Sequence, residues 1–597
     1  MRWMRTWFAA IDLVRRMVLN LAFLGVLGWL LVSVLGREGL VAPDAGILRL
    51  HPVGALVEGI EVPNAASWLR PVPPSDQVPV HQAVRLLAQA GKDARITGLL
   101  LELDDLAPSP MAELDVLRRA VLRFRNSGKP VVALAGHMDQ GQYFLASAAD
   151  RIVLRPLGSI DFKGFGVYRH YFREALARWR IDVEEVHVGR FKSAVEPLTR
   201  DAMSDDARRA NARWLSRLWR QYKRAIYEQR KLTGDPIQQL ADHPLPAMRQ
   251  AQGDMAHWLQ RAGFVDVVGG QAEARAALAT LMGTQVDSLP PFIDQDRYRG
   301  MMHEDQPPAG AARIGIILAD GAILPGEQPA GTIGAATLSR RIRQAANDDR
   351  YAALVIRLNS PGGDALASEH IRQAVLAAKR KKPVVVSMAA VAASGGYWMA
   401  SAADEIWAEP ATLTGSIGVF GVLVRIPRLL EQWHVHHDGV GTARMSAAML
   451  SSRPLPPEMR ASIEVRLQHV YDRFLDVVAE GRGQPRAAIA KAAEGRVWVS
   501  EDALARHLID HVGGLRAAVA AAARRAKVHA FSSEWIMPRQ GWRERLVAVL
   551  LGGLATSLGV DSTWIARDDI ANALRVVQTL LRQQPAILAL WPARCVF

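Results

Sequence analysis

The chain has 597 residues, which is too long for a single hydrophobic core and predicts two or more domains. Half of the residues are hydrophobic and 22% are charged, a globular composition that excludes large-scale disorder. The net charge is +14, but the basic residues are scattered, which argues against a nucleic-acid-binding groove and favours a solvated surface facing anionic lipid. Cys595 is the single cysteine, which excludes an intrachain disulfide bond and a CxxC metal site.

The first segment of note is an uncharged apolar run near the amino terminus. Met17–Gly36 contains 20 residues, enough for a helix to cross the roughly 30 Å hydrocarbon layer of a bilayer. Four arginines precede the run: Arg2, Arg5, Arg15 and Arg16. Positive charge marks the cytoplasmic side of a membrane, which predicts a cytoplasmic segment 1–16, a transmembrane anchor 17–36 and a remainder beyond the membrane. A cleaved signal peptide is the alternative, but the run is long for one and no convincing A-x-A site follows. In a bacterium, the expected location is the inner membrane with the bulk in the periplasm.

An internal repeat, with a period of about 255 residues, organises the rest of the chain. Lys129–Gly166 (KPVVALAGHMDQGQYFLASAAD…) matches Lys382–Gly421 (KPVVVSMAAVAASGGYWMASAAD…). His303–Gly310 is a polar, proline-containing linker between the copies. The repeat predicts an N-terminal domain over 37–302, a linker over 303–310 and a C-terminal domain over 311–530. A C-terminal extension of unknown role follows over 531–597.

Within each copy, short apolar runs alternate with helical stretches. LVIRL, then SPGGDALASEHIRQAVLAAKR, then PVVVSM is the pattern of a strand–helix–strand unit. Such alternation predicts an α/β fold with a parallel sheet covered by helices. Long polar helices are expected to close the copies, at Asp205–Leu232 and Pro456–Glu480.

The two copies differ where chemistry is expected. The second copy has Ser394-Gly395-Gly396-Tyr397, where the first has Gln140-Gly141-Gln142-Tyr143. The second copy also has a Pro-Gly-Gly turn at 361–363, where the first has no glycine. Glycine turns let backbone N–H groups approach a ligand oxygen, so these two strand ends could form an oxyanion hole beside Ser394. The first copy lacks these features.

A nucleophilic serine requires a base. His434, His436 and His437 cluster near the site in sequence, but their spacing favours a polar loop or an edge strand. Only 11 of the 73 basic residues are lysines, and a desolvated lysine can act as a base whereas arginine cannot. Lys192 follows a strand-like run and a glycine turn in the first copy, whereas Arg444 stands at the matching place in the second. To act near neutral pH, a lysine amine must lose about 3 pKa units through burial. From the residues alone, two glycine turns and a surface lysine remain the alternative to a Ser/Lys hydrolase.

Four segments carry a family resemblance: Gly189–Ser204 (GRFKSAVEPLTRDAMS), Arg357–Glu369 (RLNSPGGDALASE), Ala392–Ser401 (AASGGYWMAS) and Thr412–Gly421 (TLTGSIGVFG). With them, the chain resembles the long, two-copy members of peptidase family S49, the bacterial protease IV or signal peptide peptidase A type. The resemblance extends from the anchor to about residue 530. It leaves the last 65 or so residues unassigned.

The resemblance implies a fold of the ClpP/crotonase type in both copies and a serine endopeptidase activity. It implies that Ser394 is the nucleophile, Lys192 the general base and Ser416 the residue that orients the lysine. Gly395 and Gly363, the latter favoured over Gly362, would supply the oxyanion-hole N–H groups. No metal and no cofactor are implied. Cleaved signal peptides and other hydrophobic peptides are the implied substrates, and a homotetramer is the implied assembly.

Two other classes of function are less well supported. An acyl-CoA enzyme of the crotonase type would share the oxyanion-hole design, but a periplasmic anchor would not serve cytosolic CoA thioesters. A catalytically inactive, membrane-anchored scaffold of the same fold would have no need for both Lys192 and Ser394.

Overall fold

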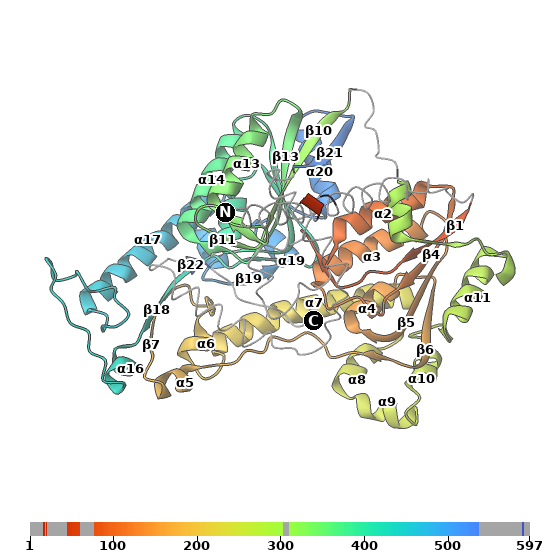
Figure 1. Cartoon of the computed structure of the whole chain (residues 1–597), viewed down its shortest axis with the longest axis horizontal. Coiled ribbons are helices and arrows are strands. Elements are labelled where there is room, and N and C mark those ends of the chain that lie inside the picture. The colour runs from red at the N-terminus through yellow and green to blue at the C-terminus, as the bar shows by residue number, and fades with distance from the viewer. Residues whose placement is uncertain are drawn as a thin grey trace, which may run out of the picture.

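The computed structural model describes residues 16, 17, 20, 45–59, 77–302, 310–536 and 588–589, the last two through their backbone (Figure 1). The predicted cytoplasmic segment, the anchor over 17–36 and the linker over 303–310 therefore lie almost wholly outside the described residues, as does most of the extension over 531–597. Among the described helices, none is long and apolar enough to cross a membrane.

The first copy forms a parallel sheet of six strands in the order β8-β6-β5-β4-β1-β9. The strands are β1 Gly46–Leu50, β4 Ile96–Glu102, β5 Val131–Asp139, β6 Arg151–Asp161, β8 Val267–Val268 and β9 Phe292–Asp294. β2 (Ala55–Val57) and β3 (Gln77–Pro79) pair separately. Helices connect the parallel strands, as such a sheet requires. The connecting helices are α2 Val80–Lys92, α3 Met111–Arg125, α4 Gln140–Ala146, α8 Pro236–Asp242, α9 Pro244–Gln250, α10 Met255–Arg261 and α11 Gln271–Met282, and α12 Gln295–Met301 follows the last strand.

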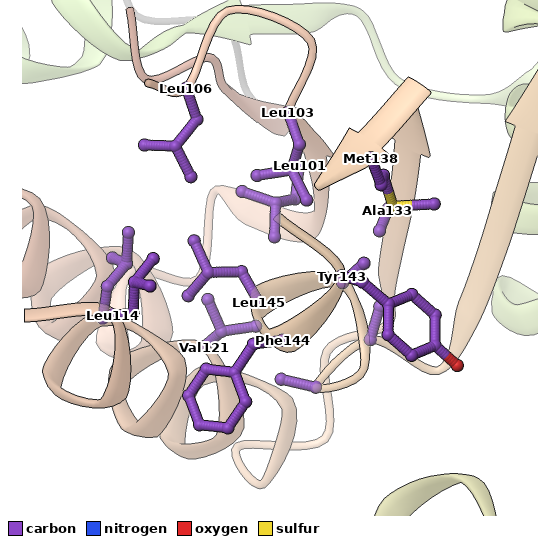
Figure 2. Close-up of a cluster of buried hydrophobic side chains, with 14 of the residues drawn as sticks. Leu101, Leu103, Leu106, Leu114, Val121, Ala133, Met138, Tyr143, Phe144 and Leu145 are labelled. Carbon is purple, nitrogen blue, oxygen red and sulfur yellow. The ribbon is translucent and has the colours of Figure 1, made fainter. Parts of the chain in front are cut away.

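The continuous apolar runs of these strands arise because both faces of the sheet are covered. Leu99 and Leu101 of β4 pack with α2 and α3, whereas Leu100 between them packs with Leu278 of α11 on the opposite face. Successive side chains of a strand point to opposite faces, so a sheet covered on both sides needs apolar residues at every position. Figure 2 shows the α3 and α4 side of this core, with labelled residues that include Leu101, Leu114, Val121, Tyr143 and Phe144.

The second copy forms an eight-stranded sheet with the path β19-β17-β15-β13-β10-β21, in which β16 also pairs with β15 and β20 pairs with β16. Its strands are β10 Ala312–Asp320, β13 Tyr351–Ser360, β15 Val384–Ala393, β16 Glu405–Ala408, β17 Leu413–Gly415, β19 Val497–Val499, β20 His511–Val512 and β21 Phe531–Trp535. Its helices are α13 Ala335–Ala346, α14 Ala365–Lys379, α15 Gly395–Ala400, α16 Pro427–Gln432, α17 Pro457–Arg482, α18 Arg486–Ala492, α19 Ser500–Leu504 and α20 Leu515–Arg525.

This second sheet is again buried on both faces. Leu354 and Ile356 pack in the cluster that includes α13 and α14, while Val355 packs with Ala518 and Ala522 of α20. The predicted strand–helix–strand unit is present as β13, α14 and β15, and the α/β class is confirmed. β21, at the start of the predicted extension, pairs with β10 at the edge of the sheet.

Two 26-residue helices correspond to the predicted long polar helices. α7 spans Asp205–Arg230, and the Ser204 side chain caps its first turn by accepting from the Ala207 N–H at 3.1 Å. α17 ends at Gly483, which has a left-handed backbone. Two shorter helices, α5 (Arg173–Arg178) and α6 (Glu196–Thr199), flank the strand that precedes Lys192.

A third sheet joins the two copies. β7 (Asp182–Val188) comes from the first copy but pairs antiparallel with β18 (Val419–Arg425) of the second along the full length of both strands. The sheet order is β12-β11-β14-β22-β18-β7, and the other members are β11 Ala322–Leu324, β12 Thr332–Gly334, β14 Gly363–Asp364 and β22 Leu588–Ala589. In Figure 1, β7 and β18 lie side by side in an arm that extends from the main body. The two copies therefore share structure and do not simply lie next to each other.

A buried ion network also connects the copies. Arg357 of the second copy is 2% exposed and binds both carboxylate oxygens of Glu58 from the first copy, at 2.5 and 2.9 Å. Its remaining nitrogen donates to Ser387 Oγ at 2.9 Å and to Glu409 Oε1 at 3.2 Å. Glu409 in turn accepts from Arg119 of the first copy. Burial alone would lower the pKa of Arg357, but the two carboxylates raise that pKa above its usual value. The guanidinium therefore stays charged between the copies.

Candidate active site

Ser394 lies at the junction between β15 and α15, in a strained backbone conformation. Its φ is 54° and its ψ is −118°, a region that costs a non-glycine residue about 1–3 kcal/mol. Two backbone hydrogen bonds hold it there: its N–H donates to Gly415 O and its carbonyl accepts from the Trp398 N–H, both at 2.8 Å. The side chain is fully buried. The fold thus fixes the hydroxyl at a sharp strand-to-helix turn.

The two glycine turns predicted to lie together are adjacent. A Cβ atom on Gly395 would lie 2.4 Å from Ser368 Oγ and 3.1 Å from the backbone nitrogen of Gly363. A side chain at position 395 would therefore displace the Ser368 hydroxyl and press on the backbone of Gly363. The N–H of Gly362 already donates to Ser360 Oγ at 3.2 Å. This bond favours Gly363 over Gly362 as the second N–H beside Ser394.

Lys192 reaches this site because β7 pairs with the second copy. The turn after β7 is held by the Phe191 N–H, which donates to Glu494 O at 2.7 Å. Gly495 lies directly behind the lysine, where a Cβ atom would come within 2.6 Å of the Lys192 backbone nitrogen. Gly495 also has a positive φ of 79°, so a larger residue there would be both strained and displaced. Glu494 and Gly495 could not be predicted from the sequence, since nothing in their local pattern indicates that another segment packs against them.

The amine of Lys192 contacts both predicted serines within one chain. Its Nζ lies 2.7 Å from Ser394 Oγ and 3.0 Å from both the carbonyl oxygen and Oγ of Ser416. A neutral amine has two N–H groups and one lone pair. If the two N–H groups donate to the oxygens of Ser416, the lone pair is left for the hydroxyl of Ser394.

Burial sets the protonation of this lysine. Lys192 is 3% exposed, and desolvation lowers the pKa of its amine from 10.5 to about 7. At neutral pH a large fraction of the amine is therefore uncharged.

Ser416, like Ser394, has a positive φ (51°) and is fully buried, and its N–H donates to Arg496 O at 2.7 Å.

The histidine cluster does not form an alternative centre in the described structure. His434, His436 and His437 are exposed in the loop after α16. Across the described residues, no group of three or more His, Cys, Asp or Glu side chains is arranged to hold a metal ion.

In the first copy, the region that corresponds to the surroundings of Ser394 is filled by side chains of that copy. Gln142 donates to the carbonyls of Leu103 and Leu106, at 2.8 and 3.0 Å. Asp139 caps α4 by accepting from the Gln142 N–H at 2.7 Å. The remaining cavity, lined in part by Pro108 and Gly141, holds only about 10 Å³, the space of a single water. The first copy thus has no room for a peptide at this place.

In chemical terms, the second copy offers a fixed hydroxyl, a partly neutral amine in contact with it, and two adjacent backbone N–H groups. This combination suits acyl transfer, in which the hydroxyl attacks a carbonyl and N–H groups stabilise the resulting oxyanion.

Several known proteins that are similar to this chain are proteases. The model of "Peptidase family S49" matches residues 123–285 and 377–529, one region in each copy. "Protease 4" of Salmonella typhi is 35% identical over 544 residues, covering 88% of this chain and 85% of the relative. "Protease 4" of Haemophilus influenzae is 33% identical over 543 residues, covering 87% of each chain. "Serine protease SPPA, chloroplastic" of Arabidopsis thaliana is 28% identical and covers 80% of this chain and 70% of the relative.

These matches confirm the resemblance inferred from the four sequence segments, whereas the finer assignment to the ClpP/crotonase type stays a prediction. The chain belongs to peptidase family S49 and is a serine protease with an S49 region in each of its two copies.

Proposed function

We propose that the protein is a membrane-anchored endopeptidase in which Ser394 is the nucleophile and Lys192 the general base. The observation that carries this proposal is the 2.7 Å distance between Lys192 Nζ and Ser394 Oγ, two atoms 202 residues apart in the chain. Both groups are buried, and the pKa of the amine is lowered to about 7, as a base working near neutral pH requires.

The geometry supports the following sequence of steps. Ser394 Oγ attacks the peptide carbonyl while Lys192 Nζ takes the hydroxyl proton. The N–H groups of Gly395 and Gly363 stabilise the oxyanion. The protonated lysine then gives its proton to the leaving amine, and an ester links the acyl group to Ser394. Water, deprotonated by the same lysine, cleaves this ester and regenerates the hydroxyl.

Ser416 acts in this scheme as a positioning residue. Its two oxygens lie 3.0 Å from Lys192 Nζ, on a backbone that is held in a strained conformation. By accepting both N–H groups of the neutral amine, Ser416 directs the lone pair of Lys192 Nζ at the hydroxyl of Ser394. The role does not require Ser416 to contact the substrate.

The proposed substrates are hydrophobic peptides, including signal peptides after their cleavage, at the periplasmic face of the bacterial inner membrane. The uncharged run Met17–Gly36 supports an anchor beside the bilayer. Near the site, Val195 and Phe420 form a small apolar cluster, and Leu366, just after β14, is 79% exposed. A homotetramer is part of the proposal. Trp179, just after α5, and Trp433, just after α16, are 61% and 73% exposed and would suit a contact between copies in such an assembly.

The pH dependence of hydrolysis follows from the lowered pKa of Lys192. The amine accepts a proton only when neutral, so kcat/KM is expected to rise as the pH increases through about 7 and to level off above it. The measurement is kcat/KM against pH for a peptide without titratable groups. A profile that is flat between about pH 6 and 9 would contradict a lysine base with this pKa.

The experiment that tests the proposed function combines hydrolysis with acylation. The full chain is incubated with an apolar peptide and, separately, with a serine-directed acylating probe, and the modified residue is located by mass spectrometry. Hydrolysis together with a label on Ser394, both absent in Ser394→Ala, is the expected result. A folded protein that neither cleaves nor becomes labelled would support the inactive scaffold instead.

A further inference from the structure

The inference concerns Arg496, a residue of the second copy that directly precedes β19. Its carbonyl accepts from the Ser416 N–H at 2.7 Å and so fixes the backbone of the residue proposed to orient the base. Two residues earlier, the carbonyl of Glu494 accepts from the N–H of Phe191, the neighbour of Lys192, also at 2.7 Å. The same short segment therefore holds both the turn of the proposed base and the serine that orients it.

The side chain of Arg496 returns to the turn of the proposed base. Its guanidinium carbon lies 4.2 Å from the centre of the Phe191 ring, well within the distance of a cation–π contact. Two hydrogen bonds hold the guanidinium over the ring: Nη1 donates to Lys491 O at 3.1 Å and Nη2 donates to Glu494 Oε2 at 3.4 Å. The side chain is 32% exposed, so it covers one face of the ring at the surface of the protein.

The low pKa of Lys192 arises from burial and not from a neighbouring charge. The charged and titratable side chains on the segments around its turn have contacts of their own: Arg190 with Asp206, His187 with Glu185, Glu196 with Ser204, Glu494 with Arg496, and Tyr471 with the backbone of Glu494. The protonation of the amine therefore depends on how well the surrounding structure keeps water away from it. The cover over Phe191 is part of that structure.

We propose that Arg496 is a positioning residue for the proposed base: its carbonyl fixes Ser416, and its guanidinium covers Phe191 and so keeps water from the amine of Lys192. The inference rests on the proposed function, because it takes Lys192 as the group that removes the proton from Ser394. It adds that a residue without contact to the reacting atoms sets the pH range in which the base works.

The test is the pH dependence of kcat/KM for the full chain with Arg496→Ala, measured with a peptide without titratable groups. Without the guanidinium, water reaches Phe191 and the amine beside it, and a hydrated amine keeps its proton to higher pH. The rise of kcat/KM with pH is therefore expected to move upward by about 1 unit. Activity at about pH 6 should fall about tenfold, while the plateau at high pH changes little.

Two further substitutions at the same position sharpen the test. Arg496→Gln, whose side chain is shorter and uncharged, should shift the profile in the same direction as alanine does. It carries the test if the alanine variant does not fold. Arg496→Lys keeps a cation that can lie over the ring of Phe191, so it should restore most of the original profile.

The matched control is Arg486→Ala, because Arg486 is a half-exposed arginine of α18 that pairs with Asp472 and Asp476. This control should leave the profile unchanged. A profile of Arg496→Ala that keeps its position on the pH axis would overturn the inference. A loss of the same size at every pH would also overturn it, since such a loss would indicate a merely structural role.

Failure of the inference can be distinguished from failure of the proposed function. If Arg496→Ala does not shift the profile but Lys192→Met has lost its activity, only the inference is wrong. If Lys192→Met retains full activity, Lys192 is not the base, and the proposed function is wrong whatever the profile of Arg496→Ala shows.

Discussion

Replacing Lys192 with methionine is expected to lower kcat/KM for peptide hydrolysis by about 10²- to 10⁴-fold, the contribution typical of a positioned general base. Methionine fills a similar volume without an amine, so Ser394 keeps its place but loses the group proposed to take its proton. The fold should be at least as stable as before, because the variant no longer buries an amine whose pKa is lowered by desolvation. The measurements are steady-state hydrolysis and a thermal melt of the same preparation.

The matched control for this variant is Lys381→Met, since Lys381 is exposed and lies in the loop after α14. This control should retain full activity. Full activity in Lys192→Met would show that another group is the base. Loss of activity together with a large drop in melting temperature would point to a structural role of the lysine.

Replacing Arg357 with alanine is expected to destabilise the protein by about 3–5 kcal/mol, the range for removing one partner of a buried ion pair. The substitution leaves Glu58 and Glu409 buried and without their shared guanidinium. Glu113 lies in the same environment. Burial, and after it the charge of Glu58, raises the pKa of Glu113 well above its usual value. The measurements are a thermal melt and denaturant unfolding.

The pH dependence of this loss of stability shows whether it arises from unpaired buried charges or from the cavity that the smaller side chain leaves. In Arg357→Ala, the buried carboxylates should have raised pKa values, so the ionised forms destabilise the variant most at high pH. The deficit relative to the wild type should therefore shrink as the pH falls and these carboxylates become protonated. A deficit that does not change with pH would indicate lost packing. Arg313→Ala, which removes a half-exposed partner of Glu534, should cost no more than about 1 kcal/mol.

The features that could be predicted from the sequence are those that leave a local pattern. The alternation of apolar strands and helices predicted the α/β class, because each strand is buried on both faces. The comparison of the two copies singled out Ser394 and Lys192, and the structure brings their side chains into contact. The glycines of the two turns were recognisable because close backbone approach excludes a side chain.

What could not be predicted depends on contacts between distant segments. The pairing of β7 with β18 uses backbone groups that every residue carries, so neither strand reveals its partner. Gly495 supports Lys192 from a loop 303 residues further along the chain, and its own surroundings resemble an ordinary turn. The ion pair between Glu58 and Arg357 spans 299 residues and has no counterpart in any local motif.

The division of the site between the copies also governs when the protein can become active. During synthesis the first copy emerges from the ribosome with Lys192 but with no serine for it to activate. The second copy brings Ser394, yet the lysine reaches it only after β7 has paired with β18. Under the proposed mechanism, proteolysis can therefore begin only after the second copy has been made and has joined the first.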